Sequence, residues 1–146
     1  MVPRALLTMT TLLLAVGITP RAVTPQWDQR AKESALADAC FEKALTQSAM
    51  NQCAGQEEVR ANAELDSTYR LLLAKAADRG ADDSRIKAMQ KAWWTYRDAY
   101  VDAWFPLPDK RVEYGSMYPM SVAMLMARLA REQTVALRAL VDQYSP

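Results

Sequence analysis

The chain of 146 residues contains no histidine, only two cysteines and only four glycines. Without histidine, Ser-His-Asp and Cys-His catalysis are excluded for this chain, and the commonest zinc ligand is missing. A formal net charge of +1 provides no excess of basic residues for a nucleic acid. We therefore expect no metal, no other cofactor and no nucleic-acid partner.

The sequence also has little that would serve catalysis by acidic side chains. The two acidic pairs, Glu57-Glu58 and Asp82-Asp83, are neighbours in the sequence, and neighbours on a helix do not face each other. Such pairs are normally solvated helix faces or charges at a helix start. No glycine-rich phosphate loop is found either. We therefore predict that the chain is not an enzyme.

Residues 1–22 have the three-part pattern of a secretory signal peptide. A basic start ending at Arg4 is followed by an apolar run over residues 5–14 and by the small residues of Ala15-Val16-Gly17. The alternative is a membrane anchor, but the run stops at Pro20-Arg21, whereas a membrane span needs about 20 apolar residues. We predict cleavage between residues 17 and 25, a periplasmic or secreted protein, and no stable membrane anchor after cleavage.

Export changes how Cys40 and Cys53 are interpreted. In an oxidising compartment an even number of cysteines most simply forms disulfides, and the spacing of this pair is too wide for a CxxC redox motif. Two buried free thiols are the alternative. A disulfide closing a loop of this length would stabilise the fold by about 3 kcal/mol.

The composition after the leader favours helices. No proline occurs between Gln26 and Phe105, and this stretch holds 17 Ala but only six Val, Ile or Thr, which is the opposite of a strand composition. Thr46 is a suitable N-cap, and Asp78-Arg79-Gly80 is a suitable stop. We predict four helices: residues 27–45, residues 47–77, a third from the Asp82-Asp83-Ser84 cap to Pro106, and residues 119–144.

These helices predict an all-α fold, a small antiparallel bundle in a single domain over residues 26–146. A bond between Cys40 and Cys53 would join the first two helices at their corner. Apolar residues spaced by three and four predict the buried faces. The third helix would bury Ile86, Met89, Trp93, Tyr96, Tyr100 and Ala103, and the fourth Leu129, Ala136, Leu137, Leu140 and Val141.

Five blocks of sequence are distinctive in combination. They are CFEKALTQSAMNQC at residues 40–53, NAELD with Tyr69 at residues 62–69, QKAWWTYRD at residues 90–98, Gly115-Ser116 with Pro119-Met120, and LRAL at residues 137–140. Together they resemble the LprI-like lysozyme inhibitor family, in its N-terminal domain. The resemblance covers about residues 39–140 and implies a small, exported, all-helical, disulfide-bonded protein. Some members of the family inhibit lysozymes or related peptidoglycan hydrolases, and some are immunity proteins against secreted hydrolases.

The chain departs from the family pattern at three places. Members often carry a second cysteine pair, at the positions of Val101 and of Met124 or Leu125, so we expect packing to replace that bond. The Asp and Asn of the second helix occur in reversed order, as Asn62 and Asp66, and an arginine expected in the last helix falls near Gln133.

One cluster of residues on the third helix has two interpretations. Arg and aromatic residues dominate binding hot spots, so it would form a recognition surface. Alternatively it is a structural motif in which Arg97 pairs with Asp66 or Glu64 and packs on Trp93, and the regular spacing favours this interpretation. The motif comprises Gln90, Trp93, Tyr96, Arg97, Asp98, Glu64 and Asp66.

Trp94 lies about 100° around the helix from Trp93, so the two cannot share one face. It either packs on Leu71 or Leu125, or is exposed and marks a partner site. The segment 106–116 is a second candidate contact, because its prolines and Gly115 constrain its path. There Lys110 and Arg111 would reach the catalytic carboxylates of a glycosidase, and Tyr114 would fill a sugar subsite. The alternative is an ordinary solvated connection.

Two functions follow from these observations. The first is inhibition of lysozyme or a related peptidoglycan hydrolase in the cell envelope, by steric occlusion of its active-site cleft. The second is a non-inhibitory helical interaction or assembly module that binds another exported protein. Both require a protein partner and no chemistry by the chain itself.

Overall fold

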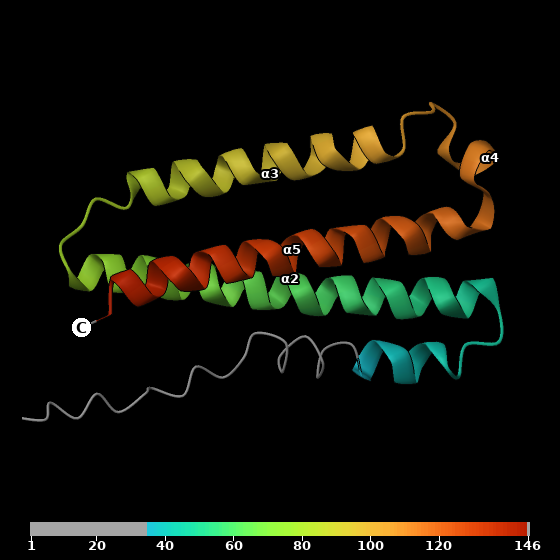
Figure 1. Cartoon of the computed structure of the whole chain (residues 1–146), viewed down its shortest axis with the longest axis horizontal. Coiled ribbons are helices and arrows are strands. Elements are labelled where there is room, and N and C mark those ends of the chain that lie inside the picture. The colour runs from blue at the N-terminus through green and yellow to red at the C-terminus, as the bar shows by residue number, and fades with distance from the viewer. Residues whose placement is uncertain (1–34, 146) are drawn as a thin grey trace, which may run out of the picture.

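The computed structural model describes residues 35–145, and every regular element among them is a helix (Figure 1). The predicted signal peptide and the first part of the predicted first helix lie outside these residues. In chain order the elements are helical residues 35–41, α2 (Gln47–Asp78), α3 (Ser84–Trp104), α4 (Lys110–Tyr114), the 3₁₀ turn η1 (Gly115–Met117) and α5 (Tyr118–Gln143). The all-α prediction is confirmed. No helix within residues 35–145 is long and apolar enough to cross a membrane.

The helix ends lie at the predicted capping residues, except that the first helix ends earlier than predicted. Thr46 caps α2, because its hydroxyl accepts a hydrogen bond from the Ala49 N–H at 3.1 Å. Gly80, at a φ of 63°, turns the chain after α2. Before α3, the Asp82 carboxylate accepts from both the backbone N–H and the hydroxyl of Ser84, at 2.9 and 2.7 Å. The first helix ends at residue 41 instead of 45.

The closest helix packing joins α2 and α5, which run parallel to each other. Both begin at the end of the molecule that carries α4, and α3, which connects them in the chain, runs in the opposite direction along the outer side of α5 (Figure 1). The register of α2 against α5 stays nearly constant along their length. Gln47 contacts Met120, 73 residues later in the chain, and Glu64 contacts Arg138, 74 residues later. Helices joined in sequence are thus antiparallel, as predicted, and the central pair is parallel.

Small side chains let α2 and α5 approach closely. Their interface contains a series of buried alanines interrupted by larger leucines, so layers of small and large residues alternate along both helices. Buried threonines satisfy their own hydroxyls, since Thr134 donates to the Ala130 carbonyl at 2.8 Å. The core comprises Ala61, Leu65, Leu72 and Ala76 of α2, Ala127, Ala130, Leu137 and Val141 of α5, and Ile86 of α3.

The buried faces differ from the predicted ones at three residues. Tyr96 and Ala103 of α3 are exposed, and their places in the core are taken by Gln90 and Val101. In α5, Ala136 is exposed as well. The buried face of α3 is turned by about one residue because α3 packs against α5 through Val101. The Tyr96 ring lies at the surface, tilted against the Tyr100 ring with centroids 5.7 Å apart.

Val101 and Leu125, for which the sequence predicted apolar packing in place of a second disulfide, lie together between α3 and α5. Each is 7% exposed, and both belong to one cluster with Phe105 and Leu129. Met124, the other candidate for that position, is 37% exposed. Of the two candidates, Leu125 is thus the one that packs with Val101 between α3 and α5.

Candidate interaction sites

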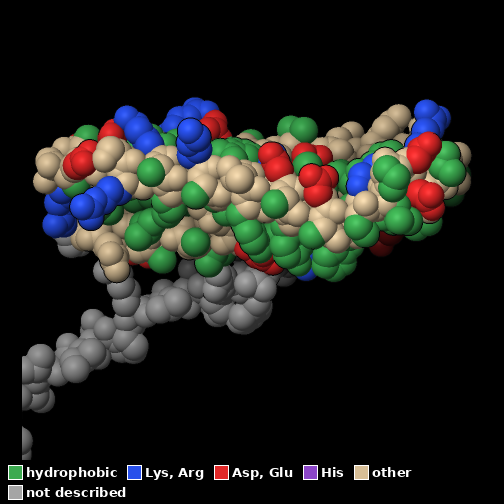
Figure 2. All heavy atoms as spheres, turned by 90° about the horizontal axis from the view of Figure 1, so that it is seen from above, with side chains coloured by type: hydrophobic (Ala, Val, Ile, Leu, Met, Phe, Trp, Pro, Cys, Tyr) green, Lys and Arg blue, Asp and Glu red, His purple; other side chains and the backbone are tan. Residues whose placement is uncertain are grey.

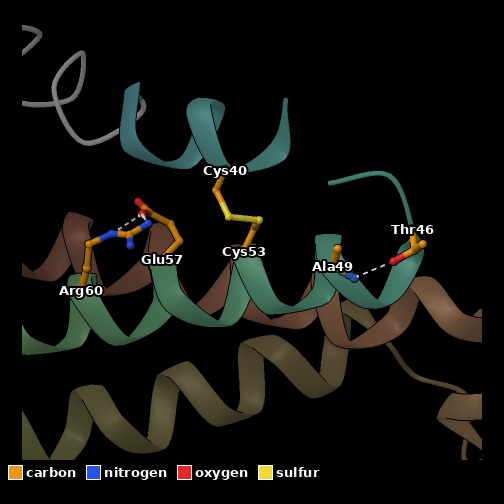
Figure 3. The surroundings of a disulfide bond; sticks show 6 residues. All are labelled: Cys40, Thr46, Ala49, Cys53, Glu57 and Arg60. Carbon is orange, nitrogen blue, oxygen red and sulfur yellow. Dashed lines mark hydrogen bonds and ion pairs between the residues drawn. A yellow bond between two sulfur atoms is a disulfide. The ribbon is translucent and has the colours of Figure 1, made fainter. Parts of the chain in front are cut away.

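The Cys40–Cys53 disulfide ties helical residues 35–41 onto α2, with a Cα–Cα distance of 5.7 Å (Figure 3). This confirms the predicted pairing of the two cysteines and the link between the first two helices. Cys53 and Ala37 are both buried, so the helical residues 35–41 cover this part of α2. The bond therefore holds in place a cover that would otherwise depend on a few apolar contacts.

Glu57 lies one turn after Cys53 and is buried, which corrects the interpretation of Glu57-Glu58 as a solvated pair. Figure 3 shows its side chain on the side of α2 that bears the disulfide. Its carboxylate pairs with Arg131 of α5 and accepts from the Arg60 Nε at 2.9 Å. Burial of a carboxylate requires such partners, because an unpaired buried charge is strongly destabilising.

Sequence reasoning missed Glu57 because it compared adjacent residues and not residues one turn apart. Glu57 falls on the same helical face as Cys53, Ala61 and Leu65. The apolar spacing of that face could have predicted that Glu57 is buried. A charged residue inside an apolar face predicts a buried partner of opposite charge on the neighbouring helix. Glu64 forms a second link of the same kind, with Arg138.

Arg97 does not pair with Asp66 as predicted. Its guanidinium pairs with the neighbouring Asp98 at 2.5 Å and lies 4.3 Å from the centroid of Trp94 and 5.9 Å from that of Trp93. Asp66 pairs instead with Arg70 on its own helix, and Glu64 pairs with Arg138 of α5. The cluster on α3 is therefore held together mainly by the helix itself, through an ion pair and cation–π contacts.

Trp94 lies at a groove between α2 and α3 and is 39% exposed. Its ring meets Trp93 edge to face at 4.8 Å. The groove has a volume of about 440 Å³, and the two most characteristic sequence blocks of the chain contribute its walls. The structure thus brings together residues of the NAELD and QKAWWTYRD blocks. The lining residues are Asn62, Ala63, Leu65, Asp66, Tyr69, Gln90 and Trp94.

The electrostatics around Arg97 include Glu58. Partial burial raises the pKa of the Glu58 carboxyl, and the positive charge of Arg97 lowers it by a smaller amount. Gln90 is buried, and its Oε1 accepts a hydrogen bond from the Gln133 amide at 3.1 Å. Gln133, near which the resemblance predicted an arginine, thus links α5 to α3 in this region.

The segment 106–116 contains the short helix α4 and is tied to the bundle by residues that were predicted to contact a partner. Lys110 donates from its ammonium to the Phe105 carbonyl at the end of α3. The Tyr114 hydroxyl accepts from the Leu107 N–H at 3.1 Å, and its ring meets Phe105 at 5.1 Å. Lys110 and Tyr114 thus make internal contacts, whereas Arg111 is exposed.

Exposed apolar side chains gather around Arg111 at this end of the molecule. Val112 is 75% exposed, and the Asn51 side chain of α2 donates to the Ser116 carbonyl at 3.1 Å, which fastens the segment to the start of α2. Figure 2 shows Lys and Arg side chains beside Asp and Glu side chains at the end that carries α4, so the charges there are mixed. The exposed apolar residues of this end are Leu45, Trp104, Leu107, Val112 and Met117.

Among the described residues, no group of three or more Cys, Asp or Glu side chains is arranged to hold a metal ion.

The model of the family Lysozyme inhibitor LprI matches residues 38–137. An uncharacterized protein of Rhizobium meliloti (strain 1021) is 35% identical over 111 residues, which cover 68% of this chain and 77% of the relative. No solved structure matches significantly.

Proposed function

Because the chain belongs to the LprI lysozyme inhibitor family, we propose that it is an exported protein of the cell envelope that inhibits a lysozyme or a related peptidoglycan hydrolase. Three observations support this proposal. Residues 1–22 have the pattern of a cleavable secretory leader. A disulfide is typical of exported proteins. The family itself implies a protein partner such as lysozyme.

The mechanism that we propose is steric occlusion of the hydrolase cleft, with no chemistry by the chain itself. The observation that carries this mechanism is the end segment 106–117. It lies at one end of the bundle (Figure 1), it exposes apolar side chains, and it is fastened by Lys110, Tyr114 and Asn51. A segment held in one shape loses little conformational entropy when it binds, so more of its contact energy becomes affinity.

Arg111 and Val112 are the residues that we assign to the contact. The cleft of a glycoside hydrolase contains two carboxyl groups, which an arginine recognises through charge-assisted hydrogen bonds. Val112 and its apolar neighbours would cover the walls of the cleft. Lys110 and Tyr114, which were predicted to contact the partner directly, support the segment from inside instead.

A turbidity assay with lysozyme and the purified mature protein tests this function. We expect inhibition by the mature protein and a loss of at least about tenfold in potency for an Arg111→Ala, Val112→Ser double variant, the effect of removing one or two interface anchors. A matched Arg85→Ala, Val59→Ser variant changes exposed residues away from α4 and should inhibit normally. Absence of inhibition by the unmodified protein would refute the inhibitor assignment, and equal potency of the two variants would refute the contact.

The exposed aromatic residues of α3 support a second candidate, a non-inhibitory module that binds another exported protein. Tyr96 and Trp104 are both more than half exposed, and Arg128 lies over the Trp104 ring at 5.6 Å. Tyr, Trp and Arg are the residues that most often dominate protein interfaces. A pull-down from envelope extract distinguishes this candidate, because it requires a captured partner that Tyr96→Ala and Trp104→Ala abolish, without inhibition of any hydrolase.

A further inference from the structure

The groove between α2 and α3 is separate from the end segment proposed to contact the hydrolase. Its walls come from residues 62–69 of α2 and residues 90–94 of α3. Its volume of about 440 Å³ falls in the range of small-molecule sites. We infer that this groove binds a short uncharged saccharide, of one or two sugar rings. The inference does not rest on the proposed inhibition.

The polar groups of the groove match the hydroxyl groups of a sugar. The Gln90 Oε1 accepts from Gln133, which orients the amide and leaves its NH₂ group as a donor. Within residues 35–145, neither the Asn62 amide nor the Trp94 indole N–H makes a hydrogen bond, so both are available to a ligand. Sugar hydroxyls donate and accept at once, and amides together with a carboxylate supply both kinds of partner.

Asp66 supplies that carboxylate. Its side chain is about half exposed and pairs with Arg70 on the same helix through Oδ2. A carboxylate has several acceptor positions, so the pairing leaves Oδ1 to accept from a ligand hydroxyl. The pair also neutralises the charge of Asp66 at the edge of the groove.

Aromatic side chains supply the apolar part of the site. Trp94 and Tyr69 line the groove from opposite helices, and aromatic rings combine a large apolar area with a polar edge. Trp94 is held by the Arg97 guanidinium and by the edge of Trp93. Because both walls are long helices and the Trp94 ring is already held in place, the site would lose little conformational entropy when a ligand binds.

The charges around the groove argue against an ionic ligand. Asp66 and the nearby Glu58 disfavour an anion, while Arg70 pairs with Asp66, and Arg97 pairs with Asp98 and lies close to Glu58. These pairs also remove most of the attraction for a cation. An apolar ligand would leave the amides of Asn62 and Gln90 without partners, which is costly. An uncharged ligand rich in hydroxyl groups satisfies all of these conditions.

A titration of the purified full chain, after removal of its leader, with N,N′-diacetylchitobiose tests the inference, followed by tryptophan fluorescence and by the NMR signal of the Trp94 indole N–H. We expect saturable binding that shifts this signal. Asp66→Ala and Asn62→Ala each remove hydrogen-bonding groups and should weaken binding by about tenfold or more. Trp104→Ala, a change of an exposed tryptophan on the same helix but away from the groove, should bind as the unmodified protein does.

The outcomes separate this inference from the inhibitor assignment. Absence of saturable binding at millimolar saccharide, or equal binding by the Asp66→Ala and unmodified proteins, would overturn the groove as a saccharide site. If a basic peptide shifted the Trp94 indole signal and no saccharide did so, the inference would also be overturned, in favour of a peptide site. None of these results bears on hydrolase inhibition, which the turbidity assay measures independently.

Discussion

The carboxylate of Glu57 in α2 and the guanidinium of Arg131 in α5 form an ion pair inside the interface of two parallel helices. The Glu57 side chain is only 1% exposed, so this charge is held almost entirely by protein partners. The two residues meet in one register of the helices, and a slip along the axis would separate the buried carboxylate of Glu57 from Arg131. The pair therefore specifies the alignment of α2 and α5.

Removal of one member of this pair should destabilise the protein strongly. We expect Glu57→Ala to lower the free energy of unfolding by about 3–5 kcal/mol, because the buried ion pair with Arg131 is lost and a cavity forms between α2 and α5. Urea denaturation followed by circular dichroism measures the change. Arg70→Ala, which breaks the exposed pair with Asp66, serves as the control and should cost less than about 1 kcal/mol. Equal costs for the two variants would contradict the structural role given to Glu57.

Replacement of both members should cost less than the two single changes together. In a Glu57→Leu, Arg131→Leu double variant no charge is left buried, and apolar packing between α2 and α5 continues. We expect a favourable coupling of about 1–3 kcal/mol in a double-mutant cycle. Additive single effects would show that the two side chains do not interact.

The disulfide should stabilise the fold by restricting the unfolded chain. Cys40 and Cys53 are separated by 13 residues, and closure of such a loop contributes about 3 kcal/mol in the chain-entropy model. We expect a Cys40→Ser, Cys53→Ser variant to lose about this amount, and a reducing agent to shift the unmodified protein equally. If the reducing agent destabilised the double variant as well, the effect would not come from this bond.

Neighbouring residues of α5 should respond very differently to truncation. Leu125 is buried against Val101, whereas Met124 is 37% exposed. We expect Leu125→Ala to cost about 2–4 kcal/mol and Met124→Ala less than about 1 kcal/mol. Thermal unfolding of the two variants beside the unmodified protein makes the comparison. The reverse order would mean that Met124, and not Leu125, packs between α3 and α5.

The start of α3 should lose stability in acid. Two hydrogen bonds from Ser84 lower the pKa of the Asp82 carboxyl below its ordinary value of 3.8. Its contribution is therefore fully present above pH 3.8 and is lost as the pH falls through the lower folded pKa. We expect the stability difference between the unmodified protein and Asp82→Ala to be constant near neutral pH and to shrink as the pH falls below 3.8. A difference that grows as the pH falls would reverse the assigned sign.

Local signals allowed the helices to be predicted closely. Thr46, Gly80 and Pro106 mark boundaries through capping and backbone geometry, which depend on a few adjacent residues. Contacts between helices were harder to predict. The parallel packing of α2 and α5 depends on how α3 and its connections place two distant segments, and nothing local to either helix encodes it. The partner of Arg97 was predicted wrongly for the same reason, because the separation of α2 and α3 was unknown.

The candidate sites show the same division. The blocks that line the groove were found as sequence patterns, but their meeting across α2 and α3 was not foreseen. The segment 106–116 was identified as constrained, yet Lys110 and Tyr114 are used within the fold. The groove depends on long-range packing of two helices. The roles of Lys110 and Tyr114 depend on short-range geometry, since each side chain bonds to a backbone group a few residues away.

The parallel arrangement of α2 and α5 has an electrostatic consequence for the whole molecule. Each long helix carries a dipole with its positive pole at the N-terminus. The dipole of α3 opposes the other two, so the dipole of about one helix remains uncompensated along the bundle. Its positive pole lies at the end where α2 and α5 begin, beside Arg111. An approaching acidic surface would thus be turned toward that end, even though the chain as a whole is nearly neutral.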